Sequence, residues 1–369
     1  MRNSAVLTVG RGLLCALASL VLSAAAFPSS AAPHVDTKPG VKEKSRIPFA
    51  QRYHAVQRGG IVRAANSAIT CRTPKGDSAC ASARAGAGAS NNEFNMFYTD
   101  VDKDPNTYNS TRAELRVPAG ARVSYARLYW GGNLRVGEQK PPRDNGRVLL
   151  AEPRGKYREV LADTVIGHRT ASGADAFQAS ANVTRLVRAS GSGMYTVAQI
   201  NVAMGRSAAG AWGGWTLVVA YEKKGAPLRH LSVWDGFDML DKNRQSVGID
   251  FGSMRMPARA AGRLGVVAYD GDRGIAGESL TVKTNRGNGM ALGNKGNPAG
   301  DVLNSSITDS GITPIKRQPA YSNTLGYDSD VFDLRGVLAS GGDRLSVRFN
   351  TKRDPVWLGA FFVEAEVRN

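Results

Sequence analysis

The chain has 369 residues, of which 48 are lysine or arginine and 31 are aspartate or glutamate, so its net charge is +17. Hydrophobic residues make up 42 % of the sequence, which is enough for a sizeable core. No apolar run of about 18 residues follows the N-terminal region, and this excludes a membrane span in the rest of the chain.

The N-terminus has the pattern of a secretory signal peptide. Arg2 and Arg11 provide a positive region, and an apolar run of small residues and leucine extends from Gly12 to Phe27. Small residues around Ala26 and Ala31 offer cleavage sites. We therefore expect residues 1–31 to be a signal peptide and the protein to be secreted; an uncleaved N-terminal anchor is the alternative.

Two cysteines, Cys71 and Cys80, remain after the predicted signal peptide. Export places them in an oxidising compartment, where two isolated cysteines in one chain normally pair. The sequence predicts a Cys71–Cys80 disulfide, and two free thiols are the alternative.

Residues 32–90 are poor in aliphatic side chains and rich in lysine, arginine, alanine, glycine and serine. The stretch from Pro33 to Ser90 has a net charge of +7. A segment of this composition buries too little apolar surface to order itself. We expect residues 32–90 to be a flexible basic arm with the short disulfide loop near its end.

From Asn91 onward, short apolar segments with period-two alternation recur between glycine, asparagine, aspartate and proline. They are Val123–Trp130, Met194–Ala203, Trp215–Glu222, Leu231–Phe237, Leu264–Tyr269, Ser279–Val282, Arg344–Asn350 and Val356–Val367. This pattern predicts an all-β fold, an antiparallel β-sandwich of jelly-roll type over residues 91–369. Asp175 to Ala189 has near-helical spacing and precedes Gly191, so one short helix is expected there.

The sequence contains no Gly-x-Ser-x-Gly, His-Glu-x-x-His or P-loop motif, and it has only four histidines. We therefore predict that the protein is not an enzyme. A secreted hydrolase of unfamiliar type is the alternative, because a triad or a carboxylate pair assembled by the fold leaves no local motif.

An acidic loop stands out at the start of the predicted sandwich. It contains three alternating aspartates and two asparagines: Asp100, Asp102, Asp104, Asn106 and Asn109. Carboxylate and amide oxygens that converge in a loop are the ligands that Ca²⁺ prefers, so these residues predict a calcium site. The alternative is that they cap turns. Two weaker repeats of the pattern occur at Asp270 to Asp272 and at Asp328 to Asp330.

Three tryptophans lie beside glycines, in the segments Trp130-Gly-Gly and Trp212-Gly-Gly-Trp215. Exposed tryptophan rings stack on sugars, which makes Trp130, Trp212 and Trp215 the candidate ligand-binding residues. The alternative is that they anchor the core, with glycine allowing close backbone approach.

The order of these motifs resembles the uncharacterised N-terminal β-domain of large bacterial cell-surface proteins that carry tandem conserved immunoglobulin-like repeats. The segments that carry the resemblance are Asp100–Ser110, Ala126–Gly132, Trp212–Glu222, Leu228–Phe237, Ala268–Gly274, Asn304–Ser306 and Leu325–Asp333. The resemblance covers about Asn91 to Asn369 and implies a β-sandwich on an exported surface protein. It implies no established activity, so it supplies no catalytic residues.

Together these features predict a secreted, non-enzymatic surface or extracellular-matrix protein, associated by charge with the anionic cell envelope or cell wall. The expected partners are anionic cell-wall polymers or surface glycans, and no motif for specific nucleic-acid recognition is present. The alternative function is a carbohydrate-binding module.

Overall fold

The computed structural model describes residues 42–44, 47–72, 78–312 and 316–368. Within these ranges the strands form four sheets, of nine, five, four and two strands, and the pairings between named strands are antiparallel. The predicted all-β antiparallel sandwich is confirmed, and each predicted strand segment overlaps a strand. The predicted signal peptide, residues 1–31, lies outside the described residues.

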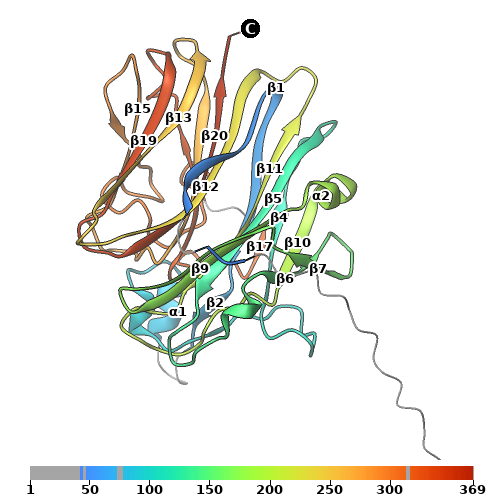
Figure 1. Ribbon diagram of the computed structural model, residues 1–369, viewed down its shortest axis with the longest axis vertical. Helices are drawn as coiled ribbons and strands as arrows, with labels where there is room; N and C mark the ends of the chain where they lie inside the picture. The colour runs from blue at the N-terminus through green and yellow to red at the C-terminus, as the bar shows by residue number, and fades with distance from the viewer. Residues whose placement is uncertain (1–41, 45–46, 73–77, 313–315, 369) are drawn as a thin grey trace, which may run out of the picture. The chain divides into compact units, whose positions relative to one another are not determined.

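The nine-stranded sheet is the centre of the fold (Figure 1). Its strands, in spatial order, are β18 (Tyr327–Asp333), β14 (Gly262–Tyr269), β20 (Val356–Glu366), β12 (Leu228–Leu240), β1 (Ile47–Ser67), β11 (Gly213–Glu222), β5 (Arg122–Asn133), β9 (Ala174–Asn182) and β8 (Thr164–Ala171).

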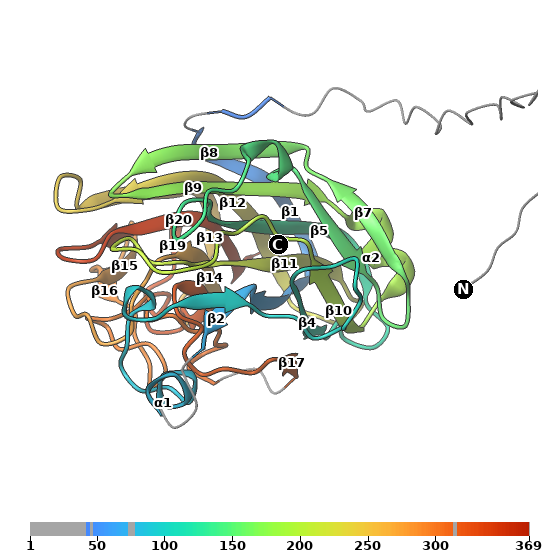
Figure 2. The same cartoon turned by 90° about the horizontal axis from the view of Figure 1, so that it is seen from below.

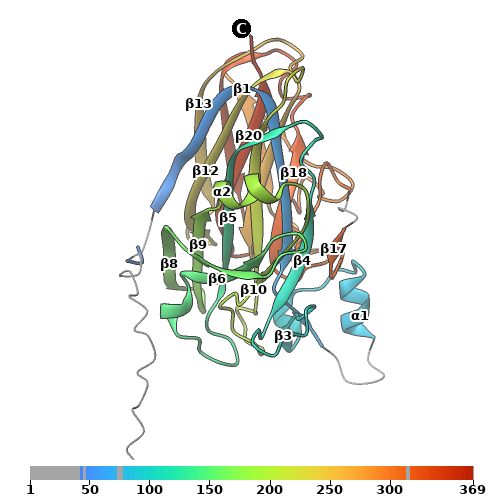
Figure 3. The same cartoon turned by 90° about the vertical axis from the view of Figure 1, so that its right-hand side faces the viewer.

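Strand β1 joins the two halves of this sheet. Its first part, up to Arg58, pairs with β12, and its second part, from Gly59, pairs with β11. Figure 3 shows β1 rising along one part of the sheet and descending along the other. Gly59 has a φ of +157°, and a Cβ there would lie 1.9 Å from the carbonyl oxygen of Tyr221. The crossing therefore requires glycine.

A five-stranded sheet covers the β11–β5–β9 half. It consists of β17 (Arg317–Gln318), β4 (Ser110–Leu115), β10 (Gly193–Ala198), β6 (Arg147–Ala151) and β7 (Tyr157–Leu161). Alternate residues of β11, such as Leu217 and Val219, share one core with Leu150 and Val197 of the small sheet. The period-two alternation of β11 thus buries one face against this layer.

A four-stranded sheet covers the other half (Figure 1). It consists of β13 (Ser246–Met256), β19 (Gly342–Asn350), β15 (Ser279–Thr284) and β16 (Met290–Ala291). Phe361 and Val363 of β20 pack in a second core with Val282 and Val347 of this sheet.

The remaining faces of the two halves pack against each other. Val218 of β11 and Phe362 of β20 belong to a third core, together with Tyr129, Leu231 and Tyr327. The nine-stranded sheet therefore folds back on itself (Figure 2), and strands of each half contribute side chains to two cores. The predicted antiparallel sandwich is thus present, and a smaller sheet covers each of its halves.

The two-stranded sheet, β2 (Ile69–Cys71) with β3 (Met96–Tyr98), lies next to helix α1 (Ala79–Arg84) in the chain. The predicted disulfide is confirmed: Cys71 and Cys80 are bonded, with their Cα atoms 5.8 Å apart. It links the end of β2 to the first turn of α1. Single 3₁₀ turns occupy Asn91–Glu93 and Pro142–Asp144.

The helix expected over Asp175 to Ala189 is corrected. Its first half is strand β9, and only Thr184–Ser190 forms helix α2. In β9, Phe177 and Ala179 belong to one core and Ala176 belongs to another, so the segment is buried on both faces. Because both faces of this segment are buried, its apolar residues follow no period-two pattern, and their spacing resembles that of a helix. Packing in the sheet overrides the helix propensity of its alanines.

The flexible arm expected over residues 32–90 is also corrected. From Ile47 onward this segment contains β1, β2 and α1, and β1 pairs first with β12 and then with β11. Three of its described cations are held in the fold. Arg52 pairs with Asp235 at 2.8 Å, Arg63 donates to the Thr308 carbonyl, and Arg84 donates to Thr70 Oγ1 at 3.1 Å.

Candidate functional site

The three tryptophans predicted to bind a ligand lie in the core. Trp130, Trp212 and Trp215 have 0 % of their surface exposed. Trp130 Nε1 donates to the Asn145 carbonyl at 2.8 Å, and Trp215 Nε1 donates to Thr111 Oγ1 at 2.8 Å. No ring face is left for a sugar, so burial corrects their assignment as ligand-binding residues and makes them core anchors.

The acidic loop Asp100 to Asn109 is organised by its own hydrogen bonds. Asp102 Oδ1 accepts from the backbone N–H of Asp104 at 2.8 Å and from Thr107 Oγ1 at 3.0 Å. Asp104 Oδ1 accepts from the backbone and side-chain nitrogens of Asn106, both at 2.9 Å. Asp100 accepts from Ser110 Oγ at 2.7 Å. These are the contacts of turn-capping carboxylates.

Asn109 lies apart from the other predicted ligands. It is buried, and its amide bridges both backbone groups of Ile200, at 2.8 and 3.0 Å. In the part of the chain that the structure describes, no three Asp, Glu, His or Cys side chains are grouped as metal ligands. Calcium binding by Asp100, Asp102, Asp104, Asn106 and Asn109 therefore stays a prediction.

The two weaker aspartate repeats prove to be neighbours. Strands β14 and β18 pair, with Tyr269 opposite Tyr327, so Asp270 and Asp328 flank the same end of this pair. Both aspartates are buried, as are Asp272, Glu278 and Asp354. Both repeats were visible in the sequence, but nothing in the sequence indicated that the pairing of two distant strands brings them together.

Asn91 links part of this buried acidic cluster. Its amide Nδ2 donates to Asp270 Oδ1 at 2.9 Å and to Asp272 Oδ1 at 3.1 Å. The backbone N–H of Asp272 donates to Asp354 Oδ2 at 2.9 Å. Burial, followed by the neighbouring charge of Asp272, raises the pKa of Asp354 to about 8. The cluster thus ties three loops together and takes up protons near neutral pH.

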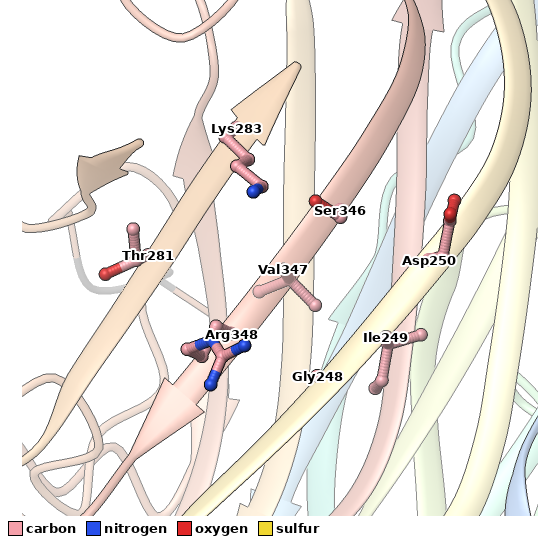
Figure 4. Close-up of a pocket in the computed structure, with 8 residues that line it drawn as sticks. All are labelled: Gly248, Ile249, Asp250, Thr281, Lys283, Ser346, Val347 and Arg348. Atoms are coloured by element: carbon pink, nitrogen blue, oxygen red, sulfur yellow. The ribbon is translucent and has the colours of Figure 1, made fainter. Parts of the chain in front are cut away.

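The outer face of the four-stranded sheet carries a different kind of site. Cross-strand pairing places Arg348 between Gly248 and Thr281, and Ser346 between Asp250 and Lys283. Because Gly248 has no side chain and Ser346 has a short one, the face is hollowed into an open depression of about 490 Å³ (Figure 4). We call this depression, lined by those residues with Ile249 and Val347, the basic face.

The cations on and beside the basic face differ in their interaction partners. Arg344 pairs with Asp250 at 3.0 Å, which neutralises the carboxylate of the basic face. Arg348 makes one long hydrogen bond, from Nη1 to Ser246 Oγ at 3.4 Å. Among the described residues neither Arg348 nor Lys283 forms an ion pair. The face therefore presents two unneutralised cations beside the hydroxyls of Ser346 and Thr281, a combination that binds anionic oxygen.

The sequence predicted parts of two strands of this face, β15 and β19, but not β13, and it did not single out Lys283 or Arg348. Arg348 lies in the polar half of the alternation in Arg344–Asn350, and Lys283 directly follows the predicted strand Ser279–Val282. None of the helices in the described part of the chain has the length and hydropathy needed to cross a bilayer.

No protein-family model matches the chain, and no curated protein matches it. Among solved structures, it is similar to the major capsid protein P2 of bacteriophage PM2, with 10 % identity, coverage of 83 % of this chain and 98 % of that chain, and a TM-score of 0.21. It is similar to SGBP-B from a xyloglucan utilization locus of Bacteroides uniformis, with 8 % identity, coverage of 88 % and 99 %, and a TM-score of 0.20. It is also similar to PNGF-II, with 10 % identity, coverage of 82 % and 66 %, and a TM-score of 0.23. Similarities at these identities and TM-scores do not indicate what the chain binds.

Proposed function

We propose that this protein is a secreted, non-enzymatic binding protein that associates with anionic polymers of the cell envelope through its basic face. The observation that carries the proposal is the pair of unneutralised cations, Arg348 and Lys283, beside two hydroxyl side chains in an open depression. The net charge of +17 supports it, because a positive surface attracts polyanions over several ångströms.

This proposal moves the adhesive site away from the N-terminal segment. The cations Arg52, Arg63 and Arg84 of that segment already have partners inside the fold, so they are not free to bind a polymer. Arg348 and Lys283 are exposed and extend from paired strands, so the spacing of their backbone positions is fixed before a ligand arrives. A preset spacing lowers the entropy cost of binding.

The proposal is tested with fluorescently labelled poly(glycerol phosphate), titrated by anisotropy at NaCl concentrations from about 0.05 to about 0.5 M. We expect binding that weakens with salt, and a loss of about tenfold or more in the double variant Lys283→Ala/Arg348→Ala, since each charged contact contributes about 1.5–3 kcal/mol.

The matched control is Lys223→Ala/Lys224→Ala, which removes the same charge from the turn between β11 and β12. It should change the affinity by less than about twofold, as expected for exposed charges away from a site. An equal loss in both double variants would show that binding follows net charge alone and would overturn the assignment to the basic face. No measurable binding by the wild type would overturn the function.

A further inference from the structure

The outer face of the five-stranded sheet carries a second depression, of about 570 Å³. One cross-strand row forms its floor: Arg112 of β4 lies opposite Thr196 of β10, which lies opposite Ala151 of β6, which lies opposite Tyr157 of β7. The two central residues are small and the two outer ones are large. The row is therefore low in the middle and raised at both ends.

The raised ends carry polar groups that are already oriented. The hydroxyl of Tyr157 donates to Asp102 Oδ2. The other carboxylate oxygen of Asp102 accepts from the Asp104 N–H and from Thr107 Oγ1, so the side chain is fixed in place. Arg112 Nε is buried and has no hydrogen-bond partner. Arg112 itself is partly exposed and lines the depression, so its terminal guanidinium nitrogens are the donors offered to a ligand oxygen.

The charges around this groove balance. Three carboxylates (Asp102, Asp104 and Glu152) and three cations (Arg112, Arg154 and Lys156) line it. A polyanion gains from the cations and is repelled by the carboxylates. A neutral polyhydroxyl ligand can donate hydrogen bonds to the carboxylates and accept them from the cations. The aromatic ring of Tyr157 adds the amphipathic surface typical of ligand contacts.

We propose that this groove binds a neutral glycan, with Arg112, Tyr157 and Asp102 as the residues that recognise it. The groove's volume lies within the range of about 300–1,000 Å³ common for ligand sites. The site lies on a different sheet from the basic face and differs from it in charge, so it constitutes a second binding activity that does not depend on the first.

The test uses four defined neutral probes: maltohexaose, cellohexaose, mannohexaose and galactohexaose, each titrated by isothermal calorimetry into the full chain. We expect at least one to bind, with an affinity that changes little between low and high salt because no net charge is neutralised. Arg112→Met keeps the packing of the side chain and removes its donors, so it should weaken binding about tenfold or more.

Tyr157→Phe keeps the ring, removes the hydroxyl and frees Asp102, and it should weaken binding by a smaller factor. This conservative change keeps the test valid if Arg112→Met does not fold. The matched control is Lys283→Ala/Arg348→Ala, which should bind the probe like the wild type even if polyanion binding is lost. Failure of all four probes to bind, or unchanged binding in both groove variants, would overturn the proposal and leave the basic face untouched.

Discussion

Arg263 and Glu364 form an ion pair whose two members bind the two backbone groups of one residue, Ile61. Arg263 Nε donates to Glu364 Oε1 at 2.7 Å, Glu364 Oε2 accepts the Ile61 N–H at 2.6 Å, and Arg263 Nη2 donates to the Ile61 carbonyl at 2.9 Å. The pair therefore joins β14 and β20 in one half of the large sheet to β1 in the other. It satisfies the open edge of β1 just after the glycine crossing.

We predict that Glu364→Ala lowers the free energy of unfolding by about 2–4 kcal/mol, because it leaves the Ile61 N–H and the Arg263 Nε without their acceptor. Urea unfolding followed by tryptophan fluorescence measures the change. Asp343→Ala breaks the exposed pair with Arg286 and should cost less than about 1 kcal/mol. Equal effects of the two substitutions on the free energy of unfolding would show that the bridge to Ile61 stabilises the fold no more than an exposed ion pair does.

Gly59→Ala should destabilise the fold by about 2 kcal/mol or more, since its Cβ would overlap the Tyr221 carbonyl and the positive φ disfavours any side chain. Gly300→Ala is the control, because a Cβ there meets nothing within 4 Å. It should leave stability almost unchanged or raise it slightly. The comparison is made by thermal denaturation, and a Gly59→Ala protein that melts with the wild type would contradict the role of this crossing.

The sequence predicted the strands whose apolar pattern is strong. Trp215–Glu222 and Val356–Val367 are almost continuously apolar because each separates two cores, and local pattern alone reveals such segments. Strand β1 escaped detection because much of its first part is exposed and polar, from Gln51 to Arg58. Its order comes from pairing with β12 and β11, whose residues lie about 170 positions away, and composition does not record such long-range pairing.

The candidate sites depended even more on pairing. The alternation of Arg344–Asn350 implied an outward polar side, but only the register places Arg348 between Gly248 and Thr281. For the same reason the alternating aspartates of the loop predicted ligands, while the fold instead directs Asn109 to Ile200 and Asp102 to Tyr157. A site on a sheet surface is formed by residues of several paired strands. The local sequence pattern does not show which strands pair or in which register.

Calcium binding by the loop Asp100 to Asn109 makes a separate prediction. An ion would have to compete with the hydrogen bonds that Asp102 and Asp104 now accept, so we expect a weak site of the extracellular type, with a dissociation constant of about 10⁻⁴–10⁻³ M. Calcium at several millimolar should raise the Tm of the wild type relative to chelator, and Asp102→Ala should abolish the increase. Superimposable wild-type curves with calcium and with chelator would leave these side chains as turn caps only.

The buried acidic cluster makes stability depend on pH. Asp354 has a pKa of about 8 in the folded protein, because of burial and then the charge of Asp272, whereas an unfolded aspartate titrates near 3.9. Between about pH 4 and pH 8 the folded form therefore binds more protons than the unfolded form. Stability must fall as the pH rises through this window, by up to about 1.4 kcal/mol per pH unit for one proton. Asp272, with a pKa of about 6, adds to the decrease in the lower half of the window.

We therefore predict that the wild type is more stable at pH 5 than at pH 8, as measured by urea unfolding in buffers of constant ionic strength. Asp354→Asn keeps an acceptor for the Asp272 N–H but removes the titration, and it should flatten the slope between pH 6 and pH 8. Asp250→Asn, at an exposed position on the basic face, is the control and should keep the wild-type slope. The expectation rests on the sign of the slope: stability that rises between pH 5 and pH 8 would mean that the cluster is ionised in the folded protein and that a cation or a rearranged hydrogen-bond network compensates its charge.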